Sequence, residues 1–396
     1  MDLTLHPRTL RGNINIIPSK SQAHRMLICA AFADSPTQIL CRETNRDIEA
    51  TAACLQALGA DIVRTETGYS VFPVHLVPEQ AILPCCESGS TLRFLLPVAG
   101  ALGVNATFLM EGRLPHRPLS PLWEEMERMG CTLSRPTENS ISCHGQLTAG
   151  EYQIPGNISS QYITGLLLAL PLLNGESQLT ITGTIESRPY IDLTRQVISL
   201  FGVDADHPGT NKFQSPGKLS VEGDWSNGAF FLAANVLGSK LTIHGLEETS
   251  IQGDRAAAHW IPLLCTKHCS IDAADIPDLV PILSVVAAAN YGAVFQNIQR
   301  LRIKESDRVK STIAMIEHLG GQAYATEDTL TIYGTGLVGG MVDAVNDHRI
   351  AMSAAIASTV CRKDVTILGA DCVQKSYPKF WEEFSRLGGT YEQYIR

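Results

Sequence analysis

The chain has 396 residues, 44% hydrophobic and 18% charged, an ordinary composition for a globular protein and enough length for two or three domains. The formal net charge is -9 and there is no long basic run, which argues against nucleic acid or an anionic membrane as a partner. The longest apolar run, residues 163–173, is too short to span a bilayer and contains a proline. Any cationic function must therefore be local, within a pocket.

Cysteine usage indicates a reducing compartment. The eleven cysteines are scattered without the spacing of zinc ligands, and Cys85 and Cys86 are directly adjacent, which suits neither a metal site nor a disulfide framework. We therefore expect free thiols in a cytoplasmic protein, with no bound metal.

A short polar stretch followed by an apolar, helix-like segment occurs six times along the chain. The polar stretches are rich in Ser, Thr, Asn, Asp and Gly, the residues that cap helix N-termini, and each such start is a potential anion site. The polar stretches are residues 19–25, 87–93, 157–161, 223–227, 275–278 and 346–349, and the apolar segments are residues 26–33, 94–102, 162–173, 230–237, 280–289 and 350–360.

Each apolar segment leads into a strand candidate, and a second, amphipathic helix pattern usually follows. The clearest strand candidates are residues 106–109, 178–181, 240–243 and 364–367. The second helices are predicted at residues 48–58, 122–129, 193–200, 309–319 and 380–387, and end at Gly59, Gly130, Gly202, Gly320 and Gly388. The fourth copy is the weakest, because residues 259–264 run on without a glycine. A period of roughly 65–70 residues predicts six copies of one compact α/β unit.

Basic residues recur beside the predicted helix starts. Each of them alone would be read as a solvated surface charge, but their common phase in the repeat favours an anion-binding site instead. They are Lys20, Arg25, Arg93, Arg117, Arg308, Arg349 and Lys375.

Two acids and one histidine stand among these cations. Asp278 precedes an apolar helix and Glu305 lies within a run of charged residues, where neighbouring cations would keep a carboxylate ionised. Either acid could serve as a general base, or Asp278 could be a helix cap and Glu305 an ion-pair partner. His348 could carry a proton, or could be a structural histidine.

Read together, these segments resemble the 5-enolpyruvylshikimate-3-phosphate synthase family of enolpyruvyl transferases over essentially the whole chain. The resemblance is carried, in order, by residues 18–25, 88–93, 117–119, 159–161, 187–190, 275–278, 304–308, 346–349 and 375.

The resemblance implies a two-domain, inside-out α/β barrel built from six βαβαββ units, three in each domain. The implied domains are residues 19–222 and residues 223–396 together with 1–18. It also implies a cytoplasmic enzyme without a cofactor, which we expect to be a monomer.

The implied reaction is transfer of the enolpyruvyl group of phosphoenolpyruvate to the 5-hydroxyl of shikimate 3-phosphate, with release of phosphate, in chorismate and aromatic amino acid biosynthesis. By resemblance, Asp278 deprotonates the attacking hydroxyl, and Glu305 with Lys20 handles the proton at the methylene carbon. The residues implied for shikimate 3-phosphate are Lys20, Ser21, Arg25, Ser159, Ser160, Gln161, Ser187, Tyr190, Asp278 and Lys304. Those implied for phosphoenolpyruvate, and for the competing inhibitor glyphosate, are Lys20, Gly89, Arg93, Arg117, Gln161, Arg308, Arg349 and Lys375.

Two features depart from the family pattern, and two rival functions remain open. Many relatives have a glycine between the residues matching Pro18 and Ser19, and Glu87 stands where asparagine is common. The nearer rival is the transferase that acts on UDP-N-acetylglucosamine, which uses a cysteine in the loop matching residues 111–117; this loop has none. The remoter rival is a non-catalytic anion-binding protein, against which the intact Asp278 and Glu305 argue.

Overall fold

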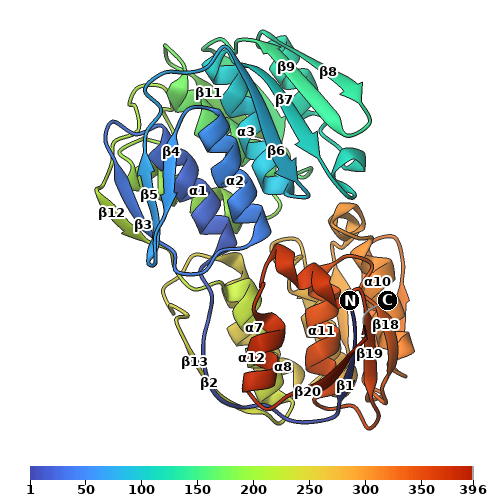
Figure 1. Ribbon diagram of the computed structural model, residues 1–396. Helices are drawn as coiled ribbons and strands as arrows, with labels where there is room; N and C mark the ends of the chain where they lie inside the picture. The colour runs from blue at the N-terminus through green and yellow to red at the C-terminus, as the bar shows by residue number, and fades with distance from the viewer. Residues whose placement is uncertain (395–396) are drawn as a thin grey trace. The chain divides into compact units, whose positions relative to one another are not determined.

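A computed structural model describes residues 1–394. The chain divides into two compact units, Pro18–Glu222 and a second unit formed by Met1–Ile17 with Gly223–Arg396. Figure 1 colours the first unit from blue to yellow-green, and the second from yellow to red with the N-terminal segment in dark blue. We describe each unit by itself and call them the 18–222 unit and the 223–396 unit.

The repeating element is seen most completely in the second repeat, where two parallel strands are joined by a helix and followed by a helix and a hairpin. Its sheet has the order β6-β7-β9-β8. Leu83 pairs with Phe108 in the parallel half, and Phe108 pairs with Ile141 in the antiparallel half. The elements are β6 (Gln80–Cys86), α3 (Gly89–Leu102), β7 (Asn105–Met110), η1 (Leu114–His116), α4 (Leu122–Arg128), β8 (Cys131–Thr137) and β9 (Ser140–Gly145).

The first and third repeats complete the 18–222 unit. The first begins with the unit's last strand, because β12 pairs in parallel with β3 and the chain thus returns to where it entered the unit. Its elements are β12 (Lys218–Ser220), α1 (Lys20–Ala31), β3 (Thr37–Leu40), α2 (Arg46–Ala57), β4 (Asp61–Arg64) and β5 (Gly68–Phe72). The third contains β10 (Glu151–Pro155), α5 (Ser160–Ala169), η2 (Leu170–Leu172), β11 (Gln178–Thr182) and α6 (Arg188–Leu200).

The 223–396 unit uses the N-terminal segment in two of its three repeats. Strand β2 pairs with β13 in the fourth repeat, and β1 lies between β19 and β20 in the sixth. The fourth repeat contains β2 (Arg11–Asn15), α7 (Trp225–Val236), β13 (Lys240–His244), η3 (Gly253–Ala256) and α8 (Ala257–Leu264). The fifth contains β14 (Cys269–Asp272), α9 (Val280–Ala289), β15 (Ala293–Gln296), η4 (Gln299–Ile303), α10 (Arg308–His318), β16 (Gln322–Ala325) and β17 (Thr329–Tyr333). The sixth contains β18 (Gly340–Asp343), α11 (His348–Ser358), β19 (Val365–Leu368), η5 (Ala370–Lys375), α12 (Phe380–Arg386), β20 (Thr390–Tyr394) and β1 (Asp2–His6).

Four repeats therefore form four-stranded sheets, whereas the third and fourth, as described, form two-stranded sheets, β10-β11 and β13-β2. The weak fourth copy predicted from the sequence is thus a unit without the antiparallel hairpin. The predicted strand and helix segments are otherwise confirmed to within a few residues.

The first helix of each repeat forms the core of its unit. Helices α3 and α5 are buried along almost their whole length, as are α9 and α11, which is typical of a helix that is apolar on all sides. Gly165 on α5 permits this packing, because a Cβ there would lie 2.2 Å from the carbonyl oxygen of Arg93 on α3. No helix within residues 1–394 is long and apolar enough to cross a membrane.

The predicted helix stops are also confirmed. Gly59, Gly130, Gly202, Gly320 and Gly388 all have φ between 77° and 114°, the left-handed conformation that ends a helix with little strain in glycine.

Candidate active site

Hydroxyl and carboxylate side chains cap the core helices, as the sequence predicts. Ser19, Ser88 and Ser159 cap α1, α3 and α5 in the 18–222 unit by accepting a hydrogen bond from a backbone amide of the first turn. Asp224 and Asp347 do the same for α7 and α11 in the 223–396 unit. Helix starts of this kind favour anions, because the first amides of a helix have no partner within the helix.

The first two turns of α1 carry two of the predicted cations in different environments. Lys20 is partly exposed, and its Nζ lies 2.8 Å from Oδ2 of Asp47 at the start of α2. Arg25 is buried; it donates from Nε to Thr194 Oγ1 at 2.8 Å and from Nη2 to the carbonyl oxygen of Tyr190 at 3.0 Å. Burial lowers the pKa of Arg25 to about 10, so its guanidinium stays charged at neutral pH.

The start of α3 brings Gly89, Arg93 and Arg117 together. Arg93 donates from Nη1 to Gln161 Oε1 at 3.2 Å and from Nη2 to the carbonyl oxygen of Pro118 at 3.2 Å. A Cβ at Gly89 would lie 2.6 Å from Nη1 of Arg93 and 2.7 Å from Nη1 of Arg117. Both guanidiniums therefore lie directly against the glycine backbone, where an anion could reach them together with the amides of the helix start.

The starts of α5 and α6 supply mostly uncharged donors. Ser159 and Ser160 open α5, and Gln161 also donates from Nε2 to Ser90 Oγ at 3.0 Å. Ser187 precedes α6 with φ of 53°, an unusual conformation for a residue other than glycine. The carbonyl oxygen of Ser21 accepts a hydrogen bond from Arg25 Nη1 at 2.6 Å, and that of Tyr190 also binds Arg25, so these residues are assembled around one buried guanidinium.

Asp278 lies among three cations in the 223–396 unit. Arg308 Nη1 is 2.6 Å from its Oδ1, Arg349 Nη2 is 3.4 Å from its Oδ2, and Lys304 Nζ is 3.6 Å from its Oδ1. Asp278 does not cap α9, whose first flanking residue is Leu279 with no side-chain cap. Of the two alternatives left open by the sequence, the structure thus excludes the helix cap.

The charges of this group shift each other's pKa values. Burial alone would raise the pKa of Asp278, but Lys304, Arg308 and Arg349 outweigh it and hold the pKa below its ordinary value. Burial, opposed by the neighbouring Asp278, lowers the pKa of Lys304 to about 8. Lys304 is therefore the cation of this group whose charge changes closest to physiological pH.

Arg308 is the centre of the group. It is 1% exposed and binds Glu305 Oε2 from Nη2 at 2.7 Å and Asp347 Oδ2 from Nε at 2.8 Å, besides its contact with Asp278. Glu305 is thus an ion-pair partner, which is compatible with a further role in proton transfer.

The start of α11 and the end of η5 contribute the remaining candidates. Arg349 is buried, and its Nε and Nη1 have no hydrogen-bond partner among residues 1–394. Buried guanidinium nitrogens without an acceptor are costly, which makes them suited to an anionic ligand. Lys375, at the end of η5, donates from Nζ to the carbonyl oxygen of Asn346 at 2.8 Å, and His348 is buried at the first position of α11.

The sequence assigned no role to two acids that the structure places in these groups. Asp47, which pairs with Lys20, lies two residues after Asn45, the cap of α2. This helix start also has a polar cap, but it belongs to a second helix of a repeat. Asp347, fully buried against Arg308, lies inside one of the predicted polar stretches, and the signal that could have singled it out is its place directly before His348 and Arg349.

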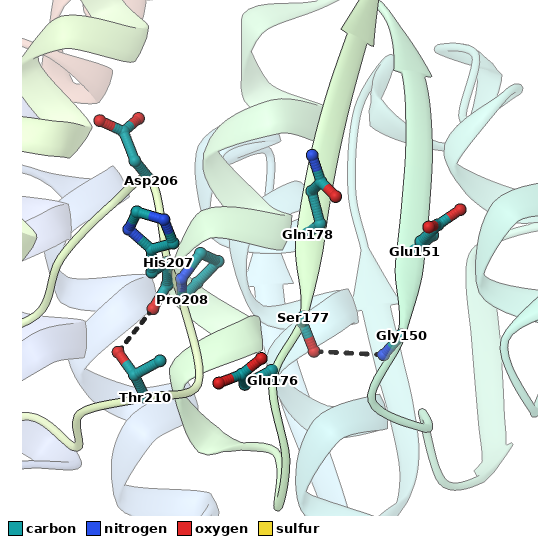
Figure 2. A pocket seen from close by; sticks show the side chains of 9 residues that line it. All are labelled: Gly150, Glu151, Glu176, Ser177, Gln178, Asp206, His207, Pro208 and Thr210. Atoms are coloured by element: carbon teal, nitrogen blue, oxygen red, sulfur yellow. Dashed lines mark hydrogen bonds between the residues drawn. The ribbon is translucent and has the colours of Figure 1, made fainter.

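None of the predicted site residues lines the pocket drawn in Figure 2, which has a volume of about 340 Å³. It lies at the start of β10 and β11, and its lining includes Glu151, Glu176, Asp206 and His207. Three carboxylates against one histidine make this pocket a poor fit for anionic ligands.

Comparison with known proteins identifies the family of the chain. The family described as EPSP synthase (3-phosphoshikimate 1-carboxyvinyltransferase) matches residues 5–263 and 263–384. The chain belongs to the EPSP synthase family. A 3-phosphoshikimate 1-carboxyvinyltransferase of Clostridium kluyveri is 37% identical over 99% of this chain and 98% of its own length. The corresponding protein of Clostridium perfringens is 39% identical over 97% of both chains.

The fold is that of EPSP synthases as well. The EPSP synthase structure from Acinetobacter baumannii superposes with a TM-score of 0.79, at 20% sequence identity, and covers 99% of this chain and all of that one. The predicted fold class is thereby confirmed.

Proposed function

We propose that this enzyme transfers the enolpyruvyl group of phosphoenolpyruvate to the 5-hydroxyl of shikimate 3-phosphate and releases phosphate. Membership of the EPSP synthase family supports the reaction. The observation that carries the chemistry is Asp278, a carboxylate held between Arg308, Arg349 and Lys304. A proton acceptor surrounded by cations suits the joining of two anions, because the same cations can hold the substrates.

The proposed reaction is an addition followed by an elimination. Asp278 takes the proton of the 5-hydroxyl as its oxygen attacks C2 of phosphoenolpyruvate, while Lys20 and Glu305 deliver a proton to C3. Loss of a proton from C3 of the tetrahedral adduct then expels phosphate and restores the double bond. Atoms and charges balance without an oxidant, a reductant or a covalent enzyme intermediate.

The charge distribution of each unit supports the proposed assignment of substrates. Ser21, Arg25, Ser159 and Ser160 are grouped around the starts of α1 and α5, where charged and neutral donors suit a phosphorylated polyol. Ser187, Tyr190, Gln161, Lys20, Asp278 and Lys304 complete the proposed set for shikimate 3-phosphate.

Phosphoenolpyruvate is assigned to the more strongly cationic residues. Arg93 and Arg117 lie against Gly89, and Arg349 has two buried nitrogens without an acceptor among residues 1–394. The remaining residues proposed for phosphoenolpyruvate are Lys20, Gln161, Arg308 and Lys375, with His348 as a proton relay. Glyphosate would compete for the same cations.

The compartment and the oligomeric state belong to the proposal too. All eleven cysteines are free thiols, nine of them buried, which supports a reducing compartment such as the cytoplasm. We expect a monomer, which size-exclusion chromatography with light scattering would test.

The acceptor is tested by steady-state release of phosphate from phosphoenolpyruvate with two alcohols in parallel. Shikimate 3-phosphate should support turnover, and UDP-N-acetylglucosamine should not. Cys86, which pairs with Met110 directly before the 111–117 loop, has its pKa raised by burial and by Glu111, which does not suit a nucleophile. Turnover with the nucleotide sugar, or with neither acceptor, would contradict the proposal.

A further inference from the structure

His24 occupies a place on α1 that the proposed chemistry does not use. It lies between Lys20 and Arg25, is 0% exposed, and its Nδ1 is 2.7 Å from Oγ1 of Thr51 on α2. Burial, with the neighbouring charges of Lys20 and Arg25, lowers the pKa of His24 well below its ordinary value, so the imidazole is neutral.

The contact with Thr51 is the first link of a chain of buried hydroxyl groups. Thr51 Oγ1 is 2.7 Å from Oγ1 of Thr91 on α3, and Thr91 Oγ1 is 2.7 Å from Oγ of Ser88, the cap of α3. All four side chains are 0% exposed. In such surroundings a hydrogen-bond chain is strong, and the loss of one member leaves its partners unsatisfied.

This chain of hydrogen bonds links three helices, two of which, α1 and α3, carry proposed substrate residues in their first turns. Helix α2 contacts both α1 and α3, and Figure 1 shows α1 and α2 next to each other. Thr91 Oγ1 also lies 3.3 Å from the backbone carbonyl oxygen of Asp47, and the carboxylate of Asp47 binds Lys20. The position of the first turn of α3, with Gly89 and Arg93, is thus coupled to the position of Lys20.

The next residue along α1 is anchored in another direction. Arg25 binds Thr194 on α6 at 2.8 Å and Thr164 on α5 at 3.2 Å, and neither threonine belongs to the chain that starts at His24. Helix α1 is therefore held to α2 and α3 by His24 and to α5 and α6 by Arg25.

The imidazole has no access to a reacting atom. Its second nitrogen, Nε2, has no hydrogen-bond partner among residues 1–394, and the ring packs edge-on against Phe94 with centroids 6.2 Å apart. This burial excludes a role for His24 in proton transfer to a substrate. It is compatible with a role in positioning other residues.

We propose that His24 is a positioning residue for phosphoenolpyruvate: through Thr51, Thr91 and Ser88 it holds the Gly89–Arg93 turn of α3 at a set distance from Lys20. The inference rests on the proposed function, because it takes these residues as the phosphoenolpyruvate site. A merely structural histidine would instead change the amount of folded enzyme, which lowers Vmax and leaves both KM values unchanged.

The test compares the KM of each substrate in four variants. His24→Leu and Thr51→Val should raise the KM for phosphoenolpyruvate about tenfold or more, because small displacements of binding groups are costly, while the KM for shikimate 3-phosphate changes less than about threefold. The matched control, Thr194→Val, removes a partner of Arg25 and should show the opposite preference. His24→Asn, whose amide can replace Nδ1, should restore the KM for phosphoenolpyruvate to within about threefold of the wild-type value.

The inference would be overturned if His24→Leu or Thr51→Val changed the two KM values equally. It would also be overturned if either variant changed neither KM. If the wild-type enzyme has no activity with shikimate 3-phosphate, the proposed function fails first. In that event the unfolding midpoints of His24→Leu, Thr91→Val and the double variant still test the hydrogen-bond chain. Additive effects would contradict it, and a double variant no less stable than the worse single variant would support it.

Discussion

The guanidinium of Arg308 and the carboxylate of Asp347 form a fully buried ion pair, with Nε 2.8 Å and Nη2 3.3 Å from its two oxygens. Arg308 is 1% and Asp347 0% exposed. Asp347 also accepts a hydrogen bond from Ser306 Oγ at 2.9 Å and from the backbone amide of Arg349 at 3.0 Å. The carboxylate of Asp347 therefore fixes both the side chain of Arg308 and the start of α11, which carries Arg349.

Replacement of this carboxylate should destabilise the 223–396 unit. We expect Asp347→Asn to lower the free energy of unfolding by at least about 2 kcal/mol, because it leaves the buried charge of Arg308 with one partner fewer. The control is Glu383→Gln, which breaks a half-exposed pair with Arg386 and should cost less than about 1 kcal/mol. Urea denaturation of both variants measures the difference, and an Asp347→Asn protein as stable as the control would contradict the account of this pair.

Asp278→Asn should separate binding from catalysis. The amide keeps the shape of the side chain but cannot accept the hydroxyl proton, so turnover should fall by a factor of about 100 to 10,000. The dissociation constant for shikimate 3-phosphate should stay within about tenfold of the wild-type value. Calorimetry and initial rates give the two numbers, with the exposed neighbour Asp275→Asn as the control; turnover near the wild-type value would rule out Asp278 as the base.

Lys304 should make the binding of shikimate 3-phosphate dependent on pH. Its pKa of about 8 lies below the ordinary value, so the ammonium is present below pH 8 and is lost as the pH rises through that value. Since the substrate phosphate is already doubly ionised at pH 7, the affinity should fall between pH 7 and pH 9, by up to about tenfold. Titration calorimetry of Lys304→Arg, which stays charged over this range, should show a flat profile. If the wild-type profile is equally flat, Lys304 does not contact the substrate.

Gly89→Ala should reduce inhibition by glyphosate. The added methyl would lie 2.6 Å from Arg93 Nη1 and 2.7 Å from Arg117 Nη1, so both guanidiniums must move, and a longer ligand tolerates that less than phosphoenolpyruvate does. We expect the inhibition constant to rise at least about tenfold, or roughly 1.4 kcal/mol, and the KM for phosphoenolpyruvate to rise by less.

Initial rates at saturating shikimate 3-phosphate, with phosphoenolpyruvate and glyphosate both varied, measure these two constants. Inhibition of the wild-type enzyme that is not competitive with phosphoenolpyruvate would mean that glyphosate binds elsewhere. Glu87 also affects the binding of glyphosate in this test. Its carboxylate lies close to Gly112 in the 111–117 loop and could itself repel the phosphonate group.

Much of the fold follows from local chemistry that is visible in the sequence. A helix start can be predicted from a single hydroxyl at the cap position, as at Ser19, Ser88 and Ser159. A helix end can be predicted from a glycine, as at Gly59 and Gly130, because the backbone there is left-handed. The third repeat lacks the antiparallel hairpin of the other complete repeats, and the sequence does not predict this difference. Residues 201–217 contain no signal that distinguishes a long connection from two short strands.

The sequence predicts which residues are candidates for the site, but it does not predict which of their side chains interact with each other. The common phase of the cations in the repeat indicates them as candidates, and the place of Asp278 before an apolar helix indicates this acid. The partnership of Arg308 with Asp347, 39 residues later, and that of Lys20 with Asp47, 27 residues later, depend on how helices pack, which spacing along the chain does not report. The same holds for His24, whose role depends on threonines of two other helices.

The central claim is that the enzyme joins phosphoenolpyruvate to shikimate 3-phosphate and releases the phosphate of the former. Phosphorus NMR of a mixture of the two substrates and the enzyme tests it most directly, because it follows every phosphorus atom at once. We expect the phosphoenolpyruvate signal to fall as inorganic phosphate rises in equal amount, while the ester phosphate of shikimate 3-phosphate is retained in a new product. Release of that ester phosphate, or consumption of phosphoenolpyruvate at the same rate without shikimate 3-phosphate, would contradict the claim.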